Sequence, residues 1–297
     1  MNGYQALRES AAWIDLSDRG KILVTGEDRA RLLHALSTND IQNLGPGETV
    51  YAFFLNEKGR VIGDAYISNF GEGLWVDTEP ELRESLFSHL ERYIIADDVT
   101  LTDISHQYAL IAIEGPNARA MQVSQQPVTN ASTTGQPAIR AFVPLAEREA
   151  YLARLAQLGI PQASKEESRV VRIENGVPRY GDDISDRYLA AETQVAHAVH
   201  PNKGCYLGQE IVERVRSQGQ VHRLLTPLRI SGTDVPAPGT RLHSDGREVG
   251  EITSAVYSPA FAEVVALGYV RREVLDRGVP ITLAGAEAPV TVRPAHS

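Results

Sequence analysis

Beyond residue 220 the pattern of apolar and polar residues changes, and this change constrains the fold more than any other feature of the sequence. Short apolar segments rich in valine, isoleucine and leucine are separated there by turn residues. The segments are 224–230, 241–243, 247–253, 264–270, 281–283 and 290–292. Ser244-Asp245-Gly246, between two of them, is typical of a hairpin turn. The pattern predicts a small antiparallel β-barrel of about 75 residues.

The preceding part of the chain interleaves strand-like and helical patterns, which favours the α+β class. Strand-like segments are 21–25, 50–55, 60–67, 73–77, 99–104 and 108–113, and helical spacing covers 27–37, 82–94, 147–158 and 164–175. Thr78-x-x-Glu81 and Ser164-x-x-Glu167 match capping boxes at two helix starts. Gly115-Pro116 predicts a short helix to about residue 123. The polar segment 125–136 is interpreted as an exposed loop without chemistry of its own.

Length, charge and hydropathy limit the class of protein. With 297 residues the chain is long enough for two domains, which we expect at 1–220 and 221–297. A net charge of −9 argues against a general nucleic-acid or membrane-surface binder, because such proteins carry a basic field. Apolar runs are shorter than the roughly 20 residues of a membrane helix, and residues 1–16 lack a signal-peptide pattern. We therefore expect a soluble, cytoplasmic protein, and a monomer.

The chain contains one cysteine, Cys205, which lies beside Gly204 and close to Lys203. A single cysteine excludes an intramolecular disulfide and a multi-cysteine metal site. A nearby cation and the start of a helical pattern could lower the pKa of the thiol below its usual value of about 8.5 and make it reactive. The alternative is a small buried side chain in a tight turn, and residue chemistry alone favours this second interpretation.

Two carboxylates, Glu174 and Asp64, are candidate functional residues. Glu174 falls in the last turn of a predicted helix, where the dipole opposes a negative charge by about 0.3–1 kcal/mol. It could pair with Arg169 or Arg172 at the surface, or accept hydrogen bonds from adjacent N–H donors of a ligand such as a pterin ring. Asp64 lies within an apolar strand, either facing solvent or held in place as a catalytic carboxylate.

Histidines and arginines give weaker signals. His197 and His200 have a spacing that could hold a metal ion, but no further ligand is convincingly placed, so we predict ordinary surface histidines and no metal site. Arg214, Arg216 and Arg223 form a basic cluster that fits the C-terminal end of a helix, where cations complement the dipole. No nucleic-acid site is predicted from these residues.

Four segments resemble a known family. Lys203-Gly204-Cys205-Tyr206-x-Gly208-Gln209-Glu210 is similar to the signature of the YgfZ family, which are folate-binding relatives of the glycine-cleavage T protein. Arg172-x-Glu174-x-Gly176 resembles the R-x-E-x-G segment of that superfamily. Gly59 to Asp64 resembles its G-x-I-x-D-D segment, except that Gly63 replaces the first aspartate. Val249-Gly250-x-Ile252-Thr253-Ser254 is similar to an element of its C-terminal barrel.

The resemblance implies a folate-binding domain of antiparallel sheets and packed helices, followed by the small β-barrel. It implies tetrahydrofolate, or a folate derivative, as cofactor. It also implies Cys205 and Asp64 as reactive groups, and it places Asp64, Arg172, Glu174, Lys203 and Tyr206 at the folate.

The function implied by the resemblance is assembly or maintenance of iron–sulfur clusters in client enzymes, including a tRNA-modifying enzyme, so that effects on tRNA processing are indirect. Folate-dependent aminomethyl transfer in glycine cleavage, or a related demethylation, is the alternative enzyme activity. The replacement by Gly63 counts against that activity. A scaffold that only holds partner proteins is a third hypothesis. Partners are expected to be folate and iron–sulfur client proteins or assembly factors.

Overall fold

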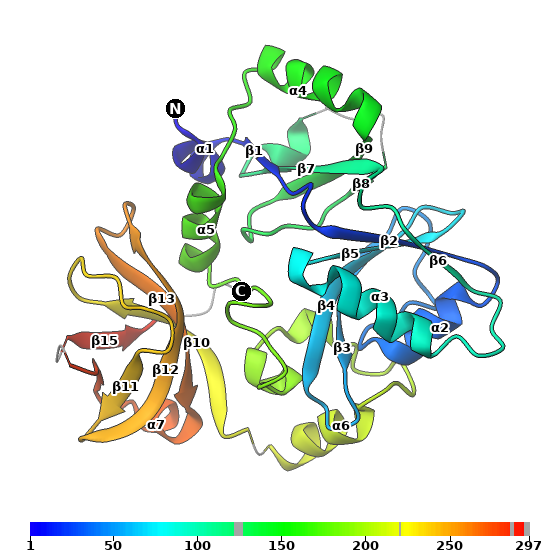
Figure 1. Ribbon diagram of the computed structural model, residues 1–297. Helices are drawn as coiled ribbons and strands as arrows, with labels where there is room; N and C mark the ends of the chain where they lie inside the picture. Colours follow the sequence, from blue (N-terminus) through cyan, green and yellow to red (C-terminus); the bar gives the residue numbers. More distant parts are fainter. Residues whose placement is uncertain (122–126, 220, 286–287, 294–297) are drawn as a thin grey trace.

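The computed structural model describes residues 1–121, 127–219, 221–285 and 288–293. Two antiparallel sheets and a barrel form the molecule, and Figure 1 shows the barrel, coloured yellow to red, to one side of the two sheets. The predicted α+β class is confirmed. Short 3-10 helices join the larger elements at η1 (Pro80–Leu82), η2 (Ala118–Ala120), η3 (Leu145–Glu147), η4 (Ala190–Thr193) and η5 (Ala196–Ala198).

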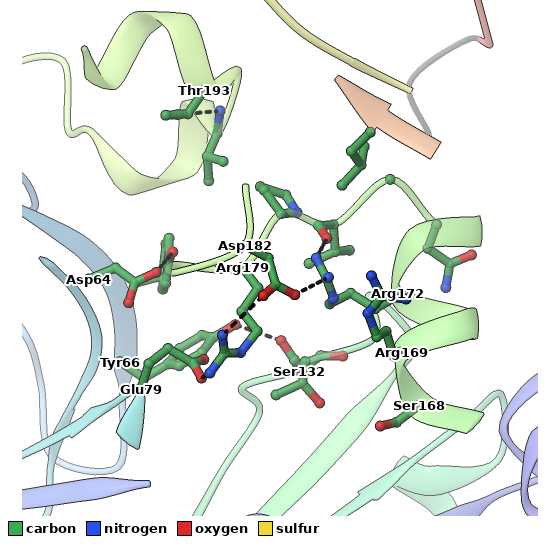
Figure 2. Close-up of a pocket in the computed structure, with 18 of the residues that line it drawn as sticks. Asp64, Tyr66, Glu79, Ser132, Ser168, Arg169, Arg172, Arg179, Asp182 and Thr193 are labelled. Atoms are coloured by element: carbon green, nitrogen blue, oxygen red, sulfur yellow. Dashed lines mark hydrogen bonds and ion pairs between the residues drawn. The ribbon is translucent and has the colours of Figure 1, made fainter. Parts of the chain in front are cut away.

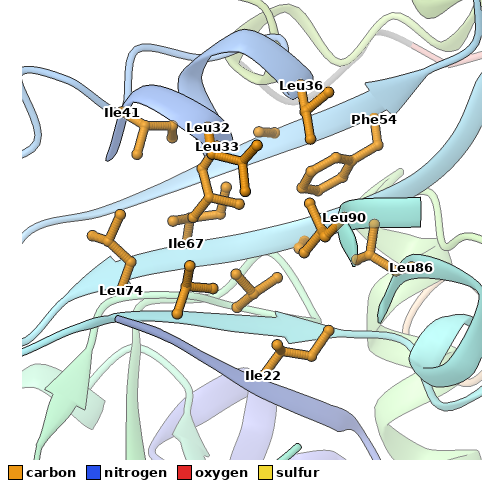
Figure 3. Close-up of a cluster of buried hydrophobic side chains, with 14 of the residues drawn as sticks. Ile22, Leu32, Leu33, Leu36, Ile41, Phe54, Ile67, Leu74, Leu86 and Leu90 are labelled. Carbon is orange, nitrogen blue, oxygen red and sulfur yellow. The ribbon is translucent and has the colours of Figure 1, made fainter. Parts of the chain in front are cut away.

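The first sheet has five antiparallel strands. In spatial order they are β3 (Thr49–Leu55), β4 (Val61–Asn69), β5 (Leu74–Thr78), β2 (Gly20–Thr25) and β6 (Thr100–Asp103). Helices α2 (Arg29–Leu36) and α3 (Arg83–Arg92) cover one face of it. Figure 3 shows Leu33 of α2 and Leu90 of α3 meeting Ile67 and Phe54 of the sheet in a buried apolar cluster. The opposite face of β3 and β4 packs against residues 184–206 through a second buried apolar cluster, which includes Phe53, Leu55 and Val61.

The second sheet has four strands, in the order β1 (Ala12–Asp15), β7 (Tyr108–Glu114), β9 (Ala138–Pro144) and β8 (Val128–Thr129). Helix α4 (Arg148–Gln157) packs on one face through Tyr151 and Leu155. Helices α1 (Gly3–Glu9) and α5 (Lys165–Glu174) pack on the other face, where Leu7 and Val171 are buried. Helix α5 therefore lies between this sheet and the barrel, which its residue Ile173 contacts at Val256 and Val265.

The barrel is closed by pairing of its first and last strands. Its order is β10 (Arg223–Ile230), β13 (Glu263–Arg271), β12 (Arg247–Ser258), β11 (Arg241–Ser244), β14 (Ile281–Leu283) and β15 (Pro289–Val292). The predicted barrel and its Ser244-Asp245-Gly246 turn are confirmed, since Asp245 and Gly246 have φ of 49° and 71°. Two helices complete the chain, α6 (Gln209–Gln218) before the barrel and α7 (Arg272–Arg277) within it.

Several local predictions are corrected. The Thr78 capping box is wrong: Thr78 ends β5, its hydroxyl donates to the Asp64 carbonyl, and α3 starts only at Arg83. The predicted helix after Gly115-Pro116 is only the turn η2, and residues 122 and 123 of that prediction lie outside the described residues.

The capping box at Ser164 is confirmed, because Ser164 Oγ accepts from Glu167 N at 3.1 Å and Glu167 Oε2 accepts from Ser164 N at 2.8 Å. Ser164→Ala should lower the free energy of unfolding by roughly 0.5–2 kcal/mol, because an orphan N–H at the start of α5 loses its acceptor. Urea denaturation measures the change. Ser217→Ala, on exposed helix α6, is the matched control and should stay within about 0.5 kcal/mol. Equal losses in both variants would contradict the prediction.

Candidate functional site

A cavity of about 590 Å³ lies where the two sheets, helix α5 and the barrel meet. Strands β3 and β4 contribute Tyr51, Asp64 and Tyr66 to its wall, and barrel strands β10 and β13 contribute Leu225, Pro227 and Leu267. Helix α5 and the segment that follows it form a polar side, which Figure 2 shows opposite Asp64. This size lies within the range of about 300–1,000 Å³ that is usual for small-molecule sites.

Asp64 is the most unusual group in the cavity. It is 4 % exposed, its Oδ2 accepts from the Tyr51 hydroxyl at 2.5 Å, and its Oδ1 has no hydrogen-bond partner among the described residues. Burial, followed by the charge of Glu79, raises the pKa of Asp64 to about 7. Burial also raises the pKa of Tyr51 well above its ordinary value, so Tyr51 stays a neutral donor. A buried carboxyl with a free acceptor oxygen and a near-neutral pKa is suited to proton transfer.

Strand alternation explains the place of Gly63. Successive residues of a strand face opposite sides of the sheet, so Gly63 faces α3 while Asp64 faces the cavity. A Cβ at position 63 would contact Leu82 Cδ1 at 3.5 Å and Leu86 Cδ1 at 3.9 Å. The replacement of an aspartate by Gly63 therefore removes no group from the cavity wall. The effect of Gly63 on transferase chemistry stays a prediction.

Behind Asp64, a buried ionic network supports the wall. Asp77 is 1 % exposed and pairs with Arg19, at 2.5 Å, and with Arg140. Burial opposes ionisation of Asp77, but the two guanidinium groups outweigh it and lower its pKa. Arg140 also lies 4.7 Å above the ring of Tyr66, so the network reaches the cavity surface. Arg19 pairs in addition with Glu79, which lines the cavity next to Asp64.

The polar segment after β8 contradicts its interpretation as an exposed loop. The carboxylate of buried Glu114 accepts hydrogen bonds from Ser132, Thr133 and Thr134, including the backbone N–H of Thr133 at 2.8 Å. The Tyr66 hydroxyl donates to the Ser132 carbonyl at 2.6 Å. Ser132 and Thr133 thereby become part of the cavity wall. Residues 125 and 126 of that interpretation lie outside the described residues.

Arg172 lines the cavity, but its guanidinium group bonds to other groups of the protein. It donates to Asp183 at 2.6 Å, to Asp182 at 2.9 Å and to the Val177 carbonyl at 2.8 Å. Asp183 in turn accepts from the hydroxyl groups of Thr253 and Ser254 on β12. Arg172 thus fastens the segment after α5 and links it to the barrel.

Glu174 lies outside the cavity lining, with a fully buried carboxylate. It accepts from the Tyr4 hydroxyl at 2.7 Å, from Ser258 and from Arg8. The expected surface pair with Arg169 or Arg172 is therefore wrong, because α1 packs on α5 and supplies Arg8 instead. Both carboxylate oxygens already have protein donors, so a pterin-binding role for Glu174 stays a prediction.

The cysteine segment forms a separate surface feature. Cys205 is exposed, which contradicts the interpretation as a buried side chain in a turn. Lys203 points the other way: its ammonium group donates to the His34 carbonyl and lies 4.7 Å from the centre of the Tyr206 ring. Burial lowers the pKa of Lys203 to about 8. None of Lys203, Cys205 and Tyr206 belongs to the described cavity lining, so the structure does not bring them to Asp64.

Within the described ranges, no three His, Cys, Asp or Glu side chains gather closely enough to hold a metal ion. His197 is exposed at the cavity, with its ring 5.6 Å from that of Tyr51, and His200 Nδ1 accepts from Asn202 N at 3.2 Å. No helix in the described part combines the length and apolar character needed to cross a membrane.

Two parts of the chain match known family models. Residues 2–140 match the GCVT N-terminal domain, and residues 223–296 match the glycine cleavage T-protein C-terminal barrel domain. An aminomethyltransferase of Rubrobacter xylanophilus is 26% identical over 98% of this chain and 84% of its own length. One from Thermus thermophilus is 29% identical over 94% of this chain and 87% of its own length.

The fold has a close counterpart among solved structures. The glycine cleavage system aminomethyltransferase T from Bartonella henselae superimposes with a TM-score of 0.88 at 19% sequence identity, over 98% of this chain and 87% of its own. At this identity the likeness establishes the fold. It confirms the predicted arrangement of an aminomethyltransferase-like domain followed by a barrel.

Proposed function

We propose that this chain, which has the N-terminal and C-terminal barrel domains of the glycine cleavage T-protein family, binds tetrahydrofolate in the cavity beside Asp64. The observation that carries the proposal is the buried Asp64 carboxyl, with one oxygen free and a pKa of about 7. The cavity volume of about 590 Å³ and its polar and apolar sides fit an elongated heteroaromatic molecule.

Bound tetrahydrofolate would supply nitrogen atoms that accept a one-carbon unit. Oδ1 of Asp64 would accept a hydrogen bond from an N–H of the pterin. The carboxyl group would also take up and return a proton near neutral pH. Tyr51 would keep the carboxyl oriented through its hydrogen bond at 2.5 Å. Arg172 and Glu174 would support the site indirectly, because their hydrogen bonds within the protein hold the end of α5 in place.

Aminomethyl transfer to tetrahydrofolate is the activity that the comparisons favour, because the relatives that match most of this chain are aminomethyltransferases. The orientation of Gly63 toward α3 is consistent with this activity, since the cavity keeps its carboxylate. The purified protein would then convert tetrahydrofolate and an aminomethylated dihydrolipoyl carrier protein to methylene-tetrahydrofolate, ammonia and the free dihydrolipoyl carrier protein. Measurement of methylene-tetrahydrofolate tests this directly, and a rate no higher than that without protein would reject the transferase activity.

Maintenance of iron–sulfur clusters is a second candidate, and exposed Cys205 favours it. Lys203 and Tyr206 anchor the segment on either side of the thiol, through the His34 carbonyl and through burial of the Tyr206 ring. The thiol is thus presented to solvent from a fixed position, where a client protein can reach it. This role follows from the resemblance of the cysteine segment to the YgfZ signature.

The activity of a [4Fe–4S] dehydratase in cells that lack the gene separates the two candidates. Under the cluster-maintenance hypothesis the wild-type gene restores dehydratase activity, whereas Cys205→Ala leaves it low at equal protein levels. Ser217→Ala, on the neighbouring exposed helix α6, should behave as wild type. Undiminished dehydratase activity without the gene would exclude cluster maintenance and leave aminomethyl transfer as the proposed activity.

A further inference from the structure

The cavity has two ends of opposite character. Figure 2 shows Asp64 on one side and Arg169, on helix α5, on the other. The Asp64 end has a free acceptor oxygen, whereas the Arg169 end carries a guanidinium group. A ligand that fills this cavity would thus meet an acceptor at one end and a cation at the other.

Cations that line the cavity are almost all neutralised by the protein itself. Lys165 pairs with Asp18 at 2.5 Å, Arg19 with Asp77 at 2.5 Å, Arg172 with Asp183 at 2.6 Å and Arg179 with Glu79 at 2.9 Å. Arg169 differs from these four. Its one hydrogen bond in the described structure goes from Nη1 to the Ala255 carbonyl on β12, at 3.1 Å, and no described carboxylate pairs with it.

The Ala255 bond fixes Arg169 at the junction between α5 and the barrel. Only Nη1 is used there, so Nε and Nη2 keep their N–H donors for a ligand. Such a guanidinium is well suited to bind a carboxylate through two parallel hydrogen bonds. Leu225, Pro227 and Leu267 of the barrel also line the cavity and provide an apolar surface on which an aromatic ring can lie.

We propose that Arg169 binds a carboxylate at the tail of the folate and so determines specificity for folates over pterins that lack a tail. This inference rests on the proposed function, because it takes tetrahydrofolate as the molecule in the cavity. Its chemistry is distinct from that of Asp64, which would act on the pterin end.

Calorimetric titrations with two ligands test the role of Arg169. One ligand is tetrahydrofolate and the other is 6-methyltetrahydropterin, which has the reduced pterin ring without the carboxylate tail. Arg169→Gln should weaken tetrahydrofolate binding about 10- to 100-fold, the loss expected for a charge-assisted hydrogen bond. Binding of the tailless pterin should change by less than about 2-fold, because it makes no charged contact with Arg169.

Two controls separate recognition of the tail from support of the fold. Arg214→Gln makes the same change in charge on exposed helix α6 and should leave both affinities unchanged. Arg169→Lys retains the positive charge and should recover part of the tetrahydrofolate affinity. Added salt should reduce the advantage of tetrahydrofolate over the tailless pterin in the wild type, but not in Arg169→Gln.

The outcomes distinguish the two proposals. Equal losses for both ligands in Arg169→Gln, or an unchanged tetrahydrofolate affinity, would overturn the role of Arg169 while the folate site stands. A wild-type protein that binds both ligands equally well would do the same. A wild-type protein that binds neither ligand would reject the proposed function, and the role of Arg169 with it.

Discussion

Asp64→Asn should lower the rate of the folate-dependent reaction by roughly 100- to 10,000-fold, which is the usual contribution of a positioned general acid or base. Asparagine has nearly the same shape and can still accept from Tyr51, but it cannot take up a proton. The measurement is methylene-tetrahydrofolate formation if the transferase activity is present. Asp276→Asn, on exposed helix α7, is the matched control and should retain the wild-type rate. A loss smaller than about 3-fold in Asp64→Asn would contradict a proton-transfer role.

The same substitution should change how stability depends on pH. The pKa of Asp64 is about 7 in the fold and about 3.9 in the unfolded chain. Because the folded state binds this proton more tightly, the stabilising contribution is full below the unfolded value and is lost as pH rises through the folded value. Wild type should therefore lose stability relative to Asp64→Asn between about pH 4 and pH 7. Parallel pH profiles of unfolding free energy would contradict the raised pKa.

Asp77→Ala should destabilise the fold by about 3–5 kcal/mol, because it leaves two buried guanidinium groups without their counter-ion. Arg19 and Arg140 are 4 % and 0 % exposed, so water cannot readily replace the carboxylate. Chemical denaturation measures the loss. Asp103→Ala on β6 removes a partner of Arg83 whose side chain is 33% exposed, and should cost about 1 kcal/mol or less. Similar losses of stability in the two variants would contradict the prediction that burial makes the Asp77 ion pairs more stabilising than an exposed pair.

Tetrahydrofolate binding should also weaken in a properly folded Asp77→Ala sample, because Arg19 orients Glu79 and Arg140 supports Tyr66 at the cavity. Asp103→Ala should bind as wild type. Unchanged affinity in Asp77→Ala would separate the ionic network from the site and leave it with a purely structural role.

The barrel could be predicted because its information is local. Each strand carries an apolar pattern, and the Ser244-Asp245-Gly246 turn specifies a tight hairpin. The prediction ended β12 at residue 253, whereas the strand continues to Ser258 after a register shift between Ile252 and Ser254. A bulge of this kind depends on pairing with β13 and has no clear local signal. Helix α7 was also missed, since its six residues show less than two turns of periodicity.

The site could be predicted only in part, because most of its contacts join distant residues. Asp64 was singled out within its motif, but its partner Tyr51 comes from the neighbouring strand through pairing of β3 and β4. Glu114 was missed because its partners lie in a polar segment that resembles a surface loop. The sequence predicted that Glu174 pairs with an arginine of its own helix. Its partner is instead Arg8, which lies in α1 near the start of the chain. Helix-on-helix packing of α1 and α5 decides that pair.

The proton exchange that accompanies tetrahydrofolate binding tests the central claim most directly. Calorimetric titrations near neutral pH, in buffers of different ionisation enthalpy, count the protons released or taken up. A ligand N–H bonded to Asp64 favours the ionised carboxylate, so binding to wild type should release protons, and Asp64→Asn should show little release. Absence of binding, or the same proton release in Asp64→Asn, would contradict a folate site built around Asp64.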